Sequence, residues 1–305
     1  MAKLLVTGGA GFIGSHLVDR LVTLGHEVVV TDNLSTGKKE NLNPAAKFIE
    51  VDIADYEKIA PHFAGVEAVF HCAALARIAP SVKDPLPSHA ANVTGTLNVL
   101  WAAKNFGVKK LIYSGSSSAY GDQPTLPLKE DKPGGLNPKS PYALQKVFGE
   151  MYCKLFSILY GLDTVILRYF NVYGPRQLTE GAYATVIGIF LKQREQGKPM
   201  TVVGDAWDRR RDYTYISDVV EANILAWKKT ISIDEMVINI GTNRNFSVRE
   251  ITERIGGPTI AIEKRPWEYQ ETKADNSKAK RLLGWEPKMR FEDGIAELKK
   301  LHHLQ

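Results

Sequence analysis

Two side chains that could transfer a proton lie four positions apart in the stretch NPKSPYALQK, residues 137–146. They are Tyr142 and Lys146, and residues with this spacing share one face of a helix. Ser140 and Pro141 predict that a helix begins here. Because a nearby ammonium favours tyrosinate, we expect Lys146 to lower the pKa of Tyr142 and make it a base nearer neutral pH. A chain with 12 tyrosines can contain such a pair by chance, so the elements around it must decide.

Hydroxyl groups precede this helix in the segment SGSSSAYG, residues 114–121, which follows the apolar run KKLIYS. A parallel sheet holds its ligand at the carboxyl ends of its strands, so we expect this segment beside the ligand. Ser116 can then bind a substrate hydroxyl by a hydrogen bond. Together with a hydride acceptor, Ser116, Tyr142 and Lys146 could oxidise a secondary alcohol.

A dinucleotide could supply that acceptor, because LLVTGGAGFIGSHLVDRL predicts a strand, a glycine turn and a helix. Gly8, Gly11 and Gly14 let the backbone approach a pyrophosphate, which the helix N-terminus attracts. Asp32 stands 18 residues after Gly14, where a carboxylate can accept hydrogen bonds from the adenosine ribose. A carboxylate there repels a 2'-phosphate, so NAD is favoured over NADP, although the lysine pair at 38–39 could weaken this preference. Asp52 is either an adenine contact or the cap of a helix over ADYEKI.

The elements that position these groups alternate between short apolar runs and helical patterns. Such runs are typical of strands buried on both faces of a parallel sheet, and they cover residues 3–7, 27–32, 47–52, 66–73, 108–114 and 163–170. The expected fold class is therefore α/β, a doubly wound parallel sheet of the Rossmann type. After residue 171 the pattern loosens, and we expect a smaller, discontinuous α/β domain there. The helix at 217–229 and the strand at 235–241 are expected to return to the large sheet.

The composition is that of an ordinary globular protein of 305 residues with a formal charge of +5. This charge suits an anionic small ligand or a weak nucleic-acid contact equally well, so it does not decide between classes of function. Cys72 and Cys153 form neither a metal-type spacing nor a disulfide framework, and the seven histidines show no ligand spacing, so no metal is expected. His71 is expected to pack against the cofactor loop. We find no signal peptide, membrane span or basic nucleic-acid motif, and we expect a soluble cytoplasmic protein without nucleic-acid or membrane partners.

The ordered motifs TGGAGFIGSH, DNLSTG, HCAA, NVTGTLNVL, SSSAYG, SPYALQK, RYFNVYGPRQ, RRDYTYISD and ADNSKAKRLLGW cover nearly the whole chain. With them the sequence resembles the extended short-chain dehydrogenase/reductases, and within these the nucleotide-sugar 4-epimerases that act on UDP-glucose and UDP-N-acetylglucosamine. The resemblance implies reversible oxidation of a UDP-hexose at C4 through a 4-keto sugar, with tightly bound NAD+ retained. It implies that Ser116, Tyr142 and Lys146 are catalytic. Many relatives have Ser-Ser-Ser where this chain has Ser114-Gly115-Ser116, so Ser117 also stays a candidate.

The expected domain organisation assigns one part of the chain to NAD and another part to the nucleotide sugar. Residues 1–170, with 214–242 returning, would form the NAD-binding domain, and the remainder of 171–305 would bind the nucleotide sugar. Residues 84–105 are expected to form a loop and a long helix, and in relatives that helix and the helix bearing Tyr142 form the homodimer interface. The implied NAD contacts are Gly8, Gly11, Phe12, Ile13, Gly14, Asp32, Asn33, Ser35, Thr36, Gly37, Asp52, Ile53, Ala73, Ala74, Asn92, Ser114, Tyr142, Lys146 and Tyr169. The implied substrate contacts are Ser116, Ser117, Asn171, Arg211, Arg265 and Thr272.

Two positions bear on which reaction of the family is catalysed. Relatives that eliminate water carry an Asp-Glu pair after the hydroxyl residue, whereas this chain has Ser117 and Ser118, which favours epimerisation. Thr272 matches the position beside the hexose C2 group, and its small size leaves room for an N-acetyl group. We therefore expect UDP-GlcNAc and UDP-GalNAc as substrates, with UDP-Glc and UDP-Gal as further candidates. A 4,6-dehydratase, a reductase, a UDP-glucuronate 4-epimerase and a non-catalytic dinucleotide sensor stay open, as does a merely solvated role for Arg209 and Arg210.

Overall fold

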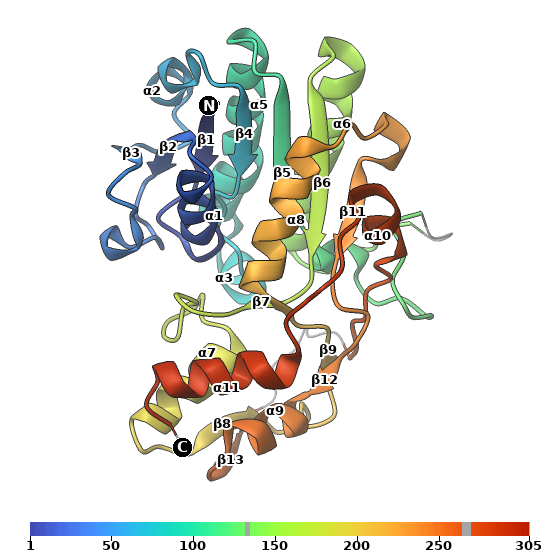
Figure 1. Ribbon diagram of the computed structural model, residues 1–305. Helices are drawn as coiled ribbons and strands as arrows, with labels where there is room; N and C mark the ends of the chain where they lie inside the picture. The colour runs from blue at the N-terminus through green and yellow to red at the C-terminus, as the bar shows by residue number, and fades with distance from the viewer. Residues whose placement is uncertain (132–134, 264–269, 305) are drawn as a thin grey trace.

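A parallel sheet forms the centre of the larger part of the molecule (Figure 1). The computed structural model describes residues 1–131, 135–263 and 270–304. Within them the sheet has seven strands in the order β11-β6-β5-β4-β1-β2-β3, all parallel. The strands are β1 (Lys3–Thr7), β2 (Glu27–Asp32), β3 (Lys47–Glu50), β4 (Ala68–His71), β5 (Lys110–Ser116), β6 (Asp163–Tyr169) and β11 (Val237–Ile240). The order reverses at β1, so the doubly wound α/β prediction is confirmed.

Helices cover both faces of this sheet. On one face α1 (Phe12–Thr23) packs against α8 (Ile216–Lys228), and on the other α5 (Gly95–Asn105) lies between α2 (Tyr56–Ile59) and α6 (Pro141–Tyr160). Successive strand residues point to opposite faces. Leu4 and Val6 therefore join the core beneath α1 and α8, while Leu5 joins the core beneath α5 and α6.

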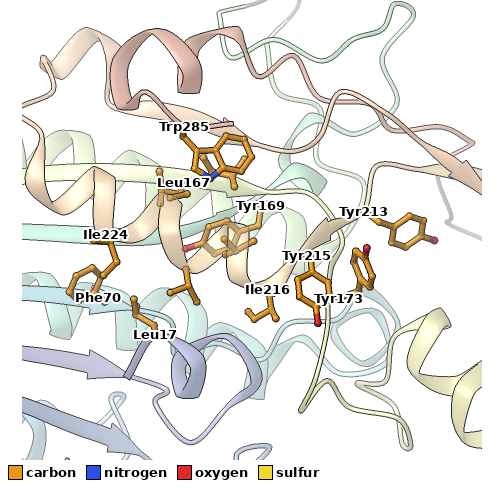
Figure 2. Packing of buried hydrophobic residues seen from close by; sticks show 14 of the residues in the cluster. Leu17, Phe70, Leu167, Tyr169, Tyr173, Tyr213, Tyr215, Ile216, Ile224 and Trp285 are labelled. Carbon is orange, nitrogen blue, oxygen red and sulfur yellow. The ribbon is translucent and has the colours of Figure 1, made fainter. Parts of the chain in front are cut away.

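The chain returns to the large sheet late in the sequence, as expected. Strand β11 pairs with β6 from Val237 opposite Ile166 to Ile240 opposite Tyr169, and α8 packs on β5 and β6. Figure 2 shows how Ile224 of α8 and Leu17 of α1 meet Phe70 and Leu167 of the sheet. The division into two domains itself stays a prediction.

The smaller part lies below the carboxyl edge of the sheet in Figure 1 and consists of short elements. Its strands pair in twos, β8 with β13 in parallel and β9 with β12 in antiparallel. The same core cluster continues into it through Tyr173 and Tyr213 (Figure 2), and it includes Phe291. The elements are β7 (Val172–Tyr173), α7 (Val186–Glu195), β8 (Met200–Val203), β9 (Arg210–Arg211), β10 (Thr214–Tyr215), β12 (Phe246–Ser247), α9 (Val248–Ile255), β13 (Thr259–Ile262) and α11 (Phe291–Leu301). Helix α10 (Ser277–Leu283) instead packs beside β11 and α8 of the larger part (Figure 1).

The segment predicted as a loop and one long helix over 84–105 is helical without a break from Pro85 to Asn105, with a π-helical turn inside it. It contains α4 (Pro85–His89), a π-helical turn over Ala90–Thr94 and α5, and it follows α3 (Ile78–Lys83). Short 3₁₀ turns occupy Lys39–Asn41, Ala60–Phe63, Ser117–Tyr120 and Ile233–Glu235. None of the helices in the described ranges combines the length and apolar character that a membrane span requires.

Candidate active site

A cavity of about 920 Å³ opens between the carboxyl edge of the large sheet and the smaller part. Residues at or just after the ends of five strands line it, namely Gly8, Asp32, Ala73, Ser116 and Tyr169. Residues of the smaller part complete the wall, from Asn171 through α7 and β8 to Thr272. The cavity therefore lies where a parallel sheet of this topology binds a ligand.

The glycine turn at one end of the cavity has no room for side chains. Gly8 has a φ of +69°, and a Cβ there would lie 2.7 Å from the backbone of Ala73. A Cβ on Gly14 would collide with the carbonyl oxygen of Gly8. Helix α1 begins at Phe12 with no side-chain cap on Gly11 and no acidic residue in its first turn, so its first N–H groups are left for a ligand. Glycines that hold the backbone open before an uncapped helix fit the pyrophosphate of NAD.

The acidic partner of this turn, Asp32, holds the loop as well as lining the cavity. Its two carboxylate oxygens accept hydrogen bonds from the N–H groups of Ala10 (3.0 Å) and Leu34 (2.8 Å). These hydrogen bonds lower the pKa of Asp32, but burial has the larger effect and raises it. Asn33 donates to Asp52 Oδ2 at 2.9 Å, and both line the cavity. The helix-cap alternative for Asp52 is wrong, because Asp55 caps α2 by accepting the N–H of Lys58.

A layer of buried polar groups supports the cavity wall. His71 lies between Thr7 Oγ1 (2.7 Å from Nδ1) and Thr96 Oγ1 (3.0 Å from Nε2), and its burial lowers its pKa to about 3. Thr7 Oγ1 in turn accepts the N–H of Ala73 at 3.2 Å. His71 thus packs behind the cofactor loop as predicted, and no group of three metal-ligating side chains occurs among the described residues.

Four predicted NAD contacts lie outside the cavity lining: Gly37, Asn92, Ser114 and Lys146. Asn92 exchanges hydrogen bonds with the backbone of Leu75 at 2.9 and 3.0 Å, which fixes the loop after β4. Ser114 contributes its carbonyl oxygen, which accepts Lys146 Nζ at 2.8 Å. The other predicted NAD contacts line the cavity.

The three predicted catalytic side chains meet where β5 ends against α6. Ser116 lies at the last position of β5, which extends two residues beyond its predicted end, and its Oγ lies 2.8 Å from Ser118 Oγ. Tyr142 stands in the first turn of α6, whose N-cap Ser140 accepts the N–H of Ala143 at 3.2 Å. Ser116, Ser117 and Tyr142 line the cavity, whereas Lys146 lies directly behind them.

The pKa of Tyr142 shifts in the direction opposite to the prediction. Burial raises the pKa of Tyr142, and only a hydrogen bond with Ser116 and the positive charge of Arg77 oppose this rise. The prediction that Lys146 lowers the pKa of the phenol is therefore wrong for this structure. The ammonium bonds to the Ser114 carbonyl, and burial lowers its own pKa to about 8.

The predicted substrate contacts Asn171, Arg211 and Thr272 all line the other side of the cavity. Asn171 has a φ of +24° and donates from Nδ2 to the Asp212 carbonyl oxygen at 3.0 Å. Thr272 is 5% exposed. The carboxylate of Asp212 accepts N–H groups from Thr242 (2.8 Å) and Ala274 (3.0 Å), and so joins the segments that carry Arg211 and Thr272. Arg265 lies outside the described residues.

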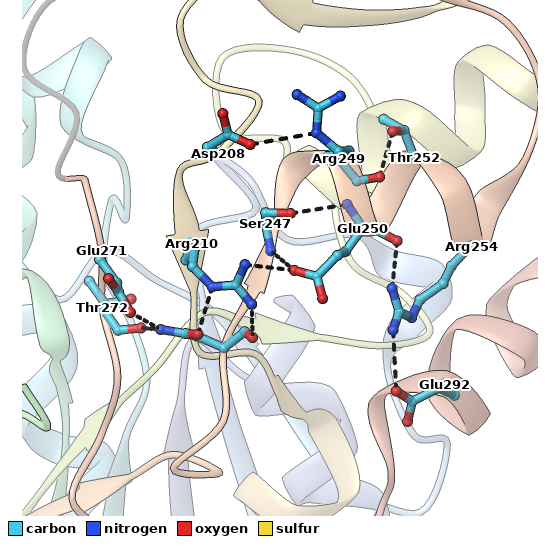
Figure 3. Close-up of polar contacts among 11 residues, drawn as sticks. Asp208, Arg210, Ser247, Arg249, Glu250, Thr252, Arg254, Glu271, Thr272 and Glu292 are labelled. Atoms are coloured by element: carbon cyan, nitrogen blue, oxygen red, sulfur yellow. Dashed lines mark hydrogen bonds and ion pairs between the residues drawn. The ribbon is translucent and has the colours of Figure 1, made fainter.

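The neighbouring arginines are not simply solvated. Arg209 is 8% exposed, lines the cavity and pairs with Asp205 at 2.9 Å. Arg210 pairs with Glu250 at 2.9 Å (Figure 3). Its Nε also donates to Asn245 Oδ1 at 2.9 Å, and the side-chain amide of Asn245 donates to the Thr272 carbonyl. This network fixes the backbone on both sides of Arg211.

Sequence reasoning missed one cation in the cavity, Arg77. It precedes α3, lines the cavity and donates from Nε to the Tyr183 carbonyl oxygen at 2.7 Å. It stands outside every motif considered above, and only the approach of α3 to α6 brings it near Tyr142. No signal within the sequence alone would have identified it.

Comparison with known proteins gives a consistent result. The model of the NAD dependent epimerase/dehydratase family matches residues 4–241. The structure of a UDP-glucose 4-epimerase from Thermotoga maritima, with UDP-glucose, is 40% identical and superimposes with a TM-score of 0.93 over 99% of this chain and 98% of that one.

Two further structures superimpose almost as well. A UDP-N-acetylglucosamine 4-epimerase from Methanobrevibacter ruminantium, in complex with UDP-N-acetylmuramic acid, is 37% identical with a TM-score of 0.90 over 98% and 97% of the two chains. A UDP-glucose 4-epimerase from Thermus thermophilus, in complex with NAD, is 36% identical with a TM-score of 0.90 over 99% of each chain.

Proposed function

The chain belongs to the NAD dependent epimerase/dehydratase family, and from this premise we propose that it is an isomerase, an NAD-dependent 4-epimerase of UDP-sugars. The observation that carries the proposal is the meeting of Ser116, Tyr142 and Lys146 at the sheet edge that also holds the glycine turn. A secondary alcohol placed there contacts a hydroxyl and a phenol within reach of the dinucleotide site.

When bound, NAD+ takes up the hydride from C4 of the sugar and later returns it. The tyrosinate form of Tyr142 accepts the proton of the 4-hydroxyl as the C4–H bonding pair leaves, and the O–H bonding pair becomes the second bond of the 4-keto group. Ser116 donates a hydrogen bond to the same oxygen and holds it against Tyr142. After the keto sugar turns its other face, Tyr142 gives the proton back, so the net redox change is zero.

Epimerisation is favoured over dehydration by the acids of the cavity. Among the described residues that line it, the only carboxylates are Asp32 and Asp52, both at the dinucleotide end. Ser117 and Ser118 follow Ser116 on the sugar side. Within the described part of the chain, the 4-keto sugar therefore meets no carboxylic acid that could protonate a leaving hydroxyl at C6.

We assign the dinucleotide end to NAD through Gly8, Gly11, Gly14 and Asp32, with Lys146 on the nicotinamide ribose. The diphosphate is assigned to Asn171, Arg211 and Arg265, because guanidinium groups bind phosphate oxygens in pairs.

The substrate proposal is UDP-GlcNAc and UDP-GalNAc, alongside UDP-Glc and UDP-Gal. Its support is Thr272, a small and buried side chain on the cavity wall, and the likeness to the enzyme from Methanobrevibacter ruminantium. Thr272→Tyr is expected to abolish turnover of the N-acetylated pair and spare the plain hexoses. Equal loss on both pairs, measured by product formation, contradicts the assignment.

The direct test of the reaction is Tyr142→Phe, which removes the phenolic oxygen and keeps the ring. The variant should bind NAD and UDP-sugar but form the 4-epimer at least about a hundredfold more slowly. Full activity in Tyr142→Phe would refute the mechanism and favour a different chemistry.

We also propose a homodimer. Helix α6 presents an exposed apolar face, formed by Leu144 (42% exposed), Phe148 (37%), Met151 (62%), Leu155 (44%) and Leu159 (58%), and Trp101 of α5 lies near its end. Large apolar side chains gathered on neighbouring helices are typical of protein interfaces.

A further inference from the structure

Arg77 places a guanidinium in the wall of the cavity, whereas Lys146 is buried outside the cavity lining. It occupies the N-cap position of α3, and its Nε donates to the Tyr183 carbonyl oxygen at 2.7 Å, which ties the side chain across 106 residues of sequence. Both Arg77 and Tyr142 line the cavity. The guanidinium is thus held in place by the protein before any ligand arrives.

The helix that begins at Arg77 is fastened to the backbone of Tyr142. Ser81 Oγ accepts the N–H of Tyr142 at 3.1 Å and donates to the Ile78 carbonyl at 2.7 Å. Ser81 is buried, and the helix that holds it packs against α6 directly after its N-cap residue Arg77. One short helix therefore fixes the phenol by its backbone and places a cation beside it.

The other titratable groups around the phenol are already engaged or uncharged. Lys146 of α6 donates to the Ser114 carbonyl, and Glu150 of the same helix pairs with Arg168. Tyr113 of β5 is buried with a raised pKa, because burial disfavours its charged form. Tyr183, from the loop before α7, offers its carbonyl oxygen to Arg77.

Arg77 itself has no carboxylate partner among the described residues. Burial lowers its pKa, and the group whose charge opposes this is Tyr142. A buried cation without a neighbouring anion is unfavourable, and the negative charge of a tyrosinate at Tyr142 would compensate the charge of Arg77. The two side chains are therefore electrostatic partners once Tyr142 gives up its proton.

We propose that Arg77 is a positioning residue for Tyr142, which holds the phenol toward the sugar and stabilises its deprotonated form from the substrate side of the cavity. This rests on the proposed function in so far as Tyr142 is the base. Lys146 then acts mainly on β5 and the dinucleotide, and Arg77 on the phenol.

The first test is the pH dependence of kcat/KM for 4-epimer formation in Arg77→Gln, Arg77→Lys and Lys83→Gln. Lys83 lies on the same helix but is exposed and outside the cavity, so it controls for loss of one positive charge. Arg77→Gln should move the low-pH fall of kcat/KM (its acid limb) to higher pH by about one unit, so that kcat/KM is roughly tenfold lower than in the wild type below the midpoint of the limb and equal to it above, since an adjacent cation moves a phenol pKa by about a unit or more. Arg77→Lys should restore most of the acid limb, and Lys83→Gln should leave it unchanged.

An acid limb at the same pH as in the wild type in Arg77→Gln, with no rescue by lysine, would overturn the proposal in favour of a packing role. The second test needs no turnover. The tyrosinate absorbance of each protein is titrated with and without Tyr142→Phe, and the difference reports the Tyr142 phenol. A rise of its pKa in Arg77→Gln supports the proposal even if no UDP-sugar is converted, and an unchanged difference titration refutes it whatever the reaction is.

Discussion

Helix α6, which carries Tyr142 and Lys146, is fastened to the sheet by a buried ion pair, and this pair gives a quantitative test. Arg168 of β6 donates from Nε to Glu150 Oε1 at 2.9 Å and from its second nitrogen to Oε2 at 2.6 Å. The two side chains are 4% and 5% exposed. Glu150 lies one helical turn after Lys146, so the pair fixes the part of α6 that supports the site.

Glu150→Gln removes the negative charge and leaves the guanidinium buried without a counter-ion. Breaking such a pair costs about 3–5 kcal/mol, because the remaining charge cannot regain its hydration. The matched control is Glu195→Gln, which breaks the exposed pair with Lys192 (2.8 Å) and should change the free energy of unfolding by less than about 1 kcal/mol.

The assay is equilibrium unfolding in urea, followed by far-ultraviolet circular dichroism for the wild type and both variants. The double variant Glu150→Leu with Arg168→Leu should recover part of the loss seen in Glu150→Leu alone, since it buries no charge. A loss below about 1 kcal/mol in Glu150→Gln, or strict additivity in the double variant, would refute the reasoning.

Three further outcomes follow from the geometry. Gly8→Ala should lower the NAD content of the purified protein, measured by absorbance. The left-handed backbone at φ +69° adds about 1–3 kcal/mol of strain to an alanine, and the new Cβ collides with the backbone of Ala73. An unchanged NAD content contradicts this expectation. His71 has a pKa near 3 when folded, below its ordinary 6.5, so its neutral form contributes stability that is present above pH 6.5 and lost on acidification toward pH 3, by up to about 1.4 kcal/mol per pH unit. His71→Gln should flatten that part of the unfolding free energy against pH, and an equally steep profile argues against it. Leu155→Glu should convert a dimer to monomers in light scattering, and a persistent dimer would place the interface elsewhere.

Much of the site could be predicted because its signals are local in the sequence. The glycine turn, Asp32 and the pair Tyr142 and Lys146 depend on strand ends and helix starts that neighbouring residues specify. The parallel sheet likewise follows from apolar runs that are buried on both faces. These features needed no knowledge of how distant segments meet.

The remaining features depend on contacts between segments that are distant in the sequence. Arg77 reaches Tyr142 only because α3 packs on α6, and its tether, the Tyr183 carbonyl, belongs to a distant loop. The pKa of Tyr142 was predicted in the wrong direction because burial of the phenol, which spacing does not report, outweighs the neighbouring charges. Asp55, and not Asp52, caps α2 because the helix begins at Tyr56, and Asp52 is engaged with Asn33 instead.

The most direct test of the account is proton NMR of the purified protein with UDP-GlcNAc, and separately with UDP-Glc, without added cofactor. The account predicts that the 4-epimer appears from both sugars to an equilibrium mixture, with no loss of water and no net change of NAD. Loss of water from the sugar, a requirement for stoichiometric reduced cofactor, or no conversion of either UDP-sugar by protein that contains NAD would contradict it.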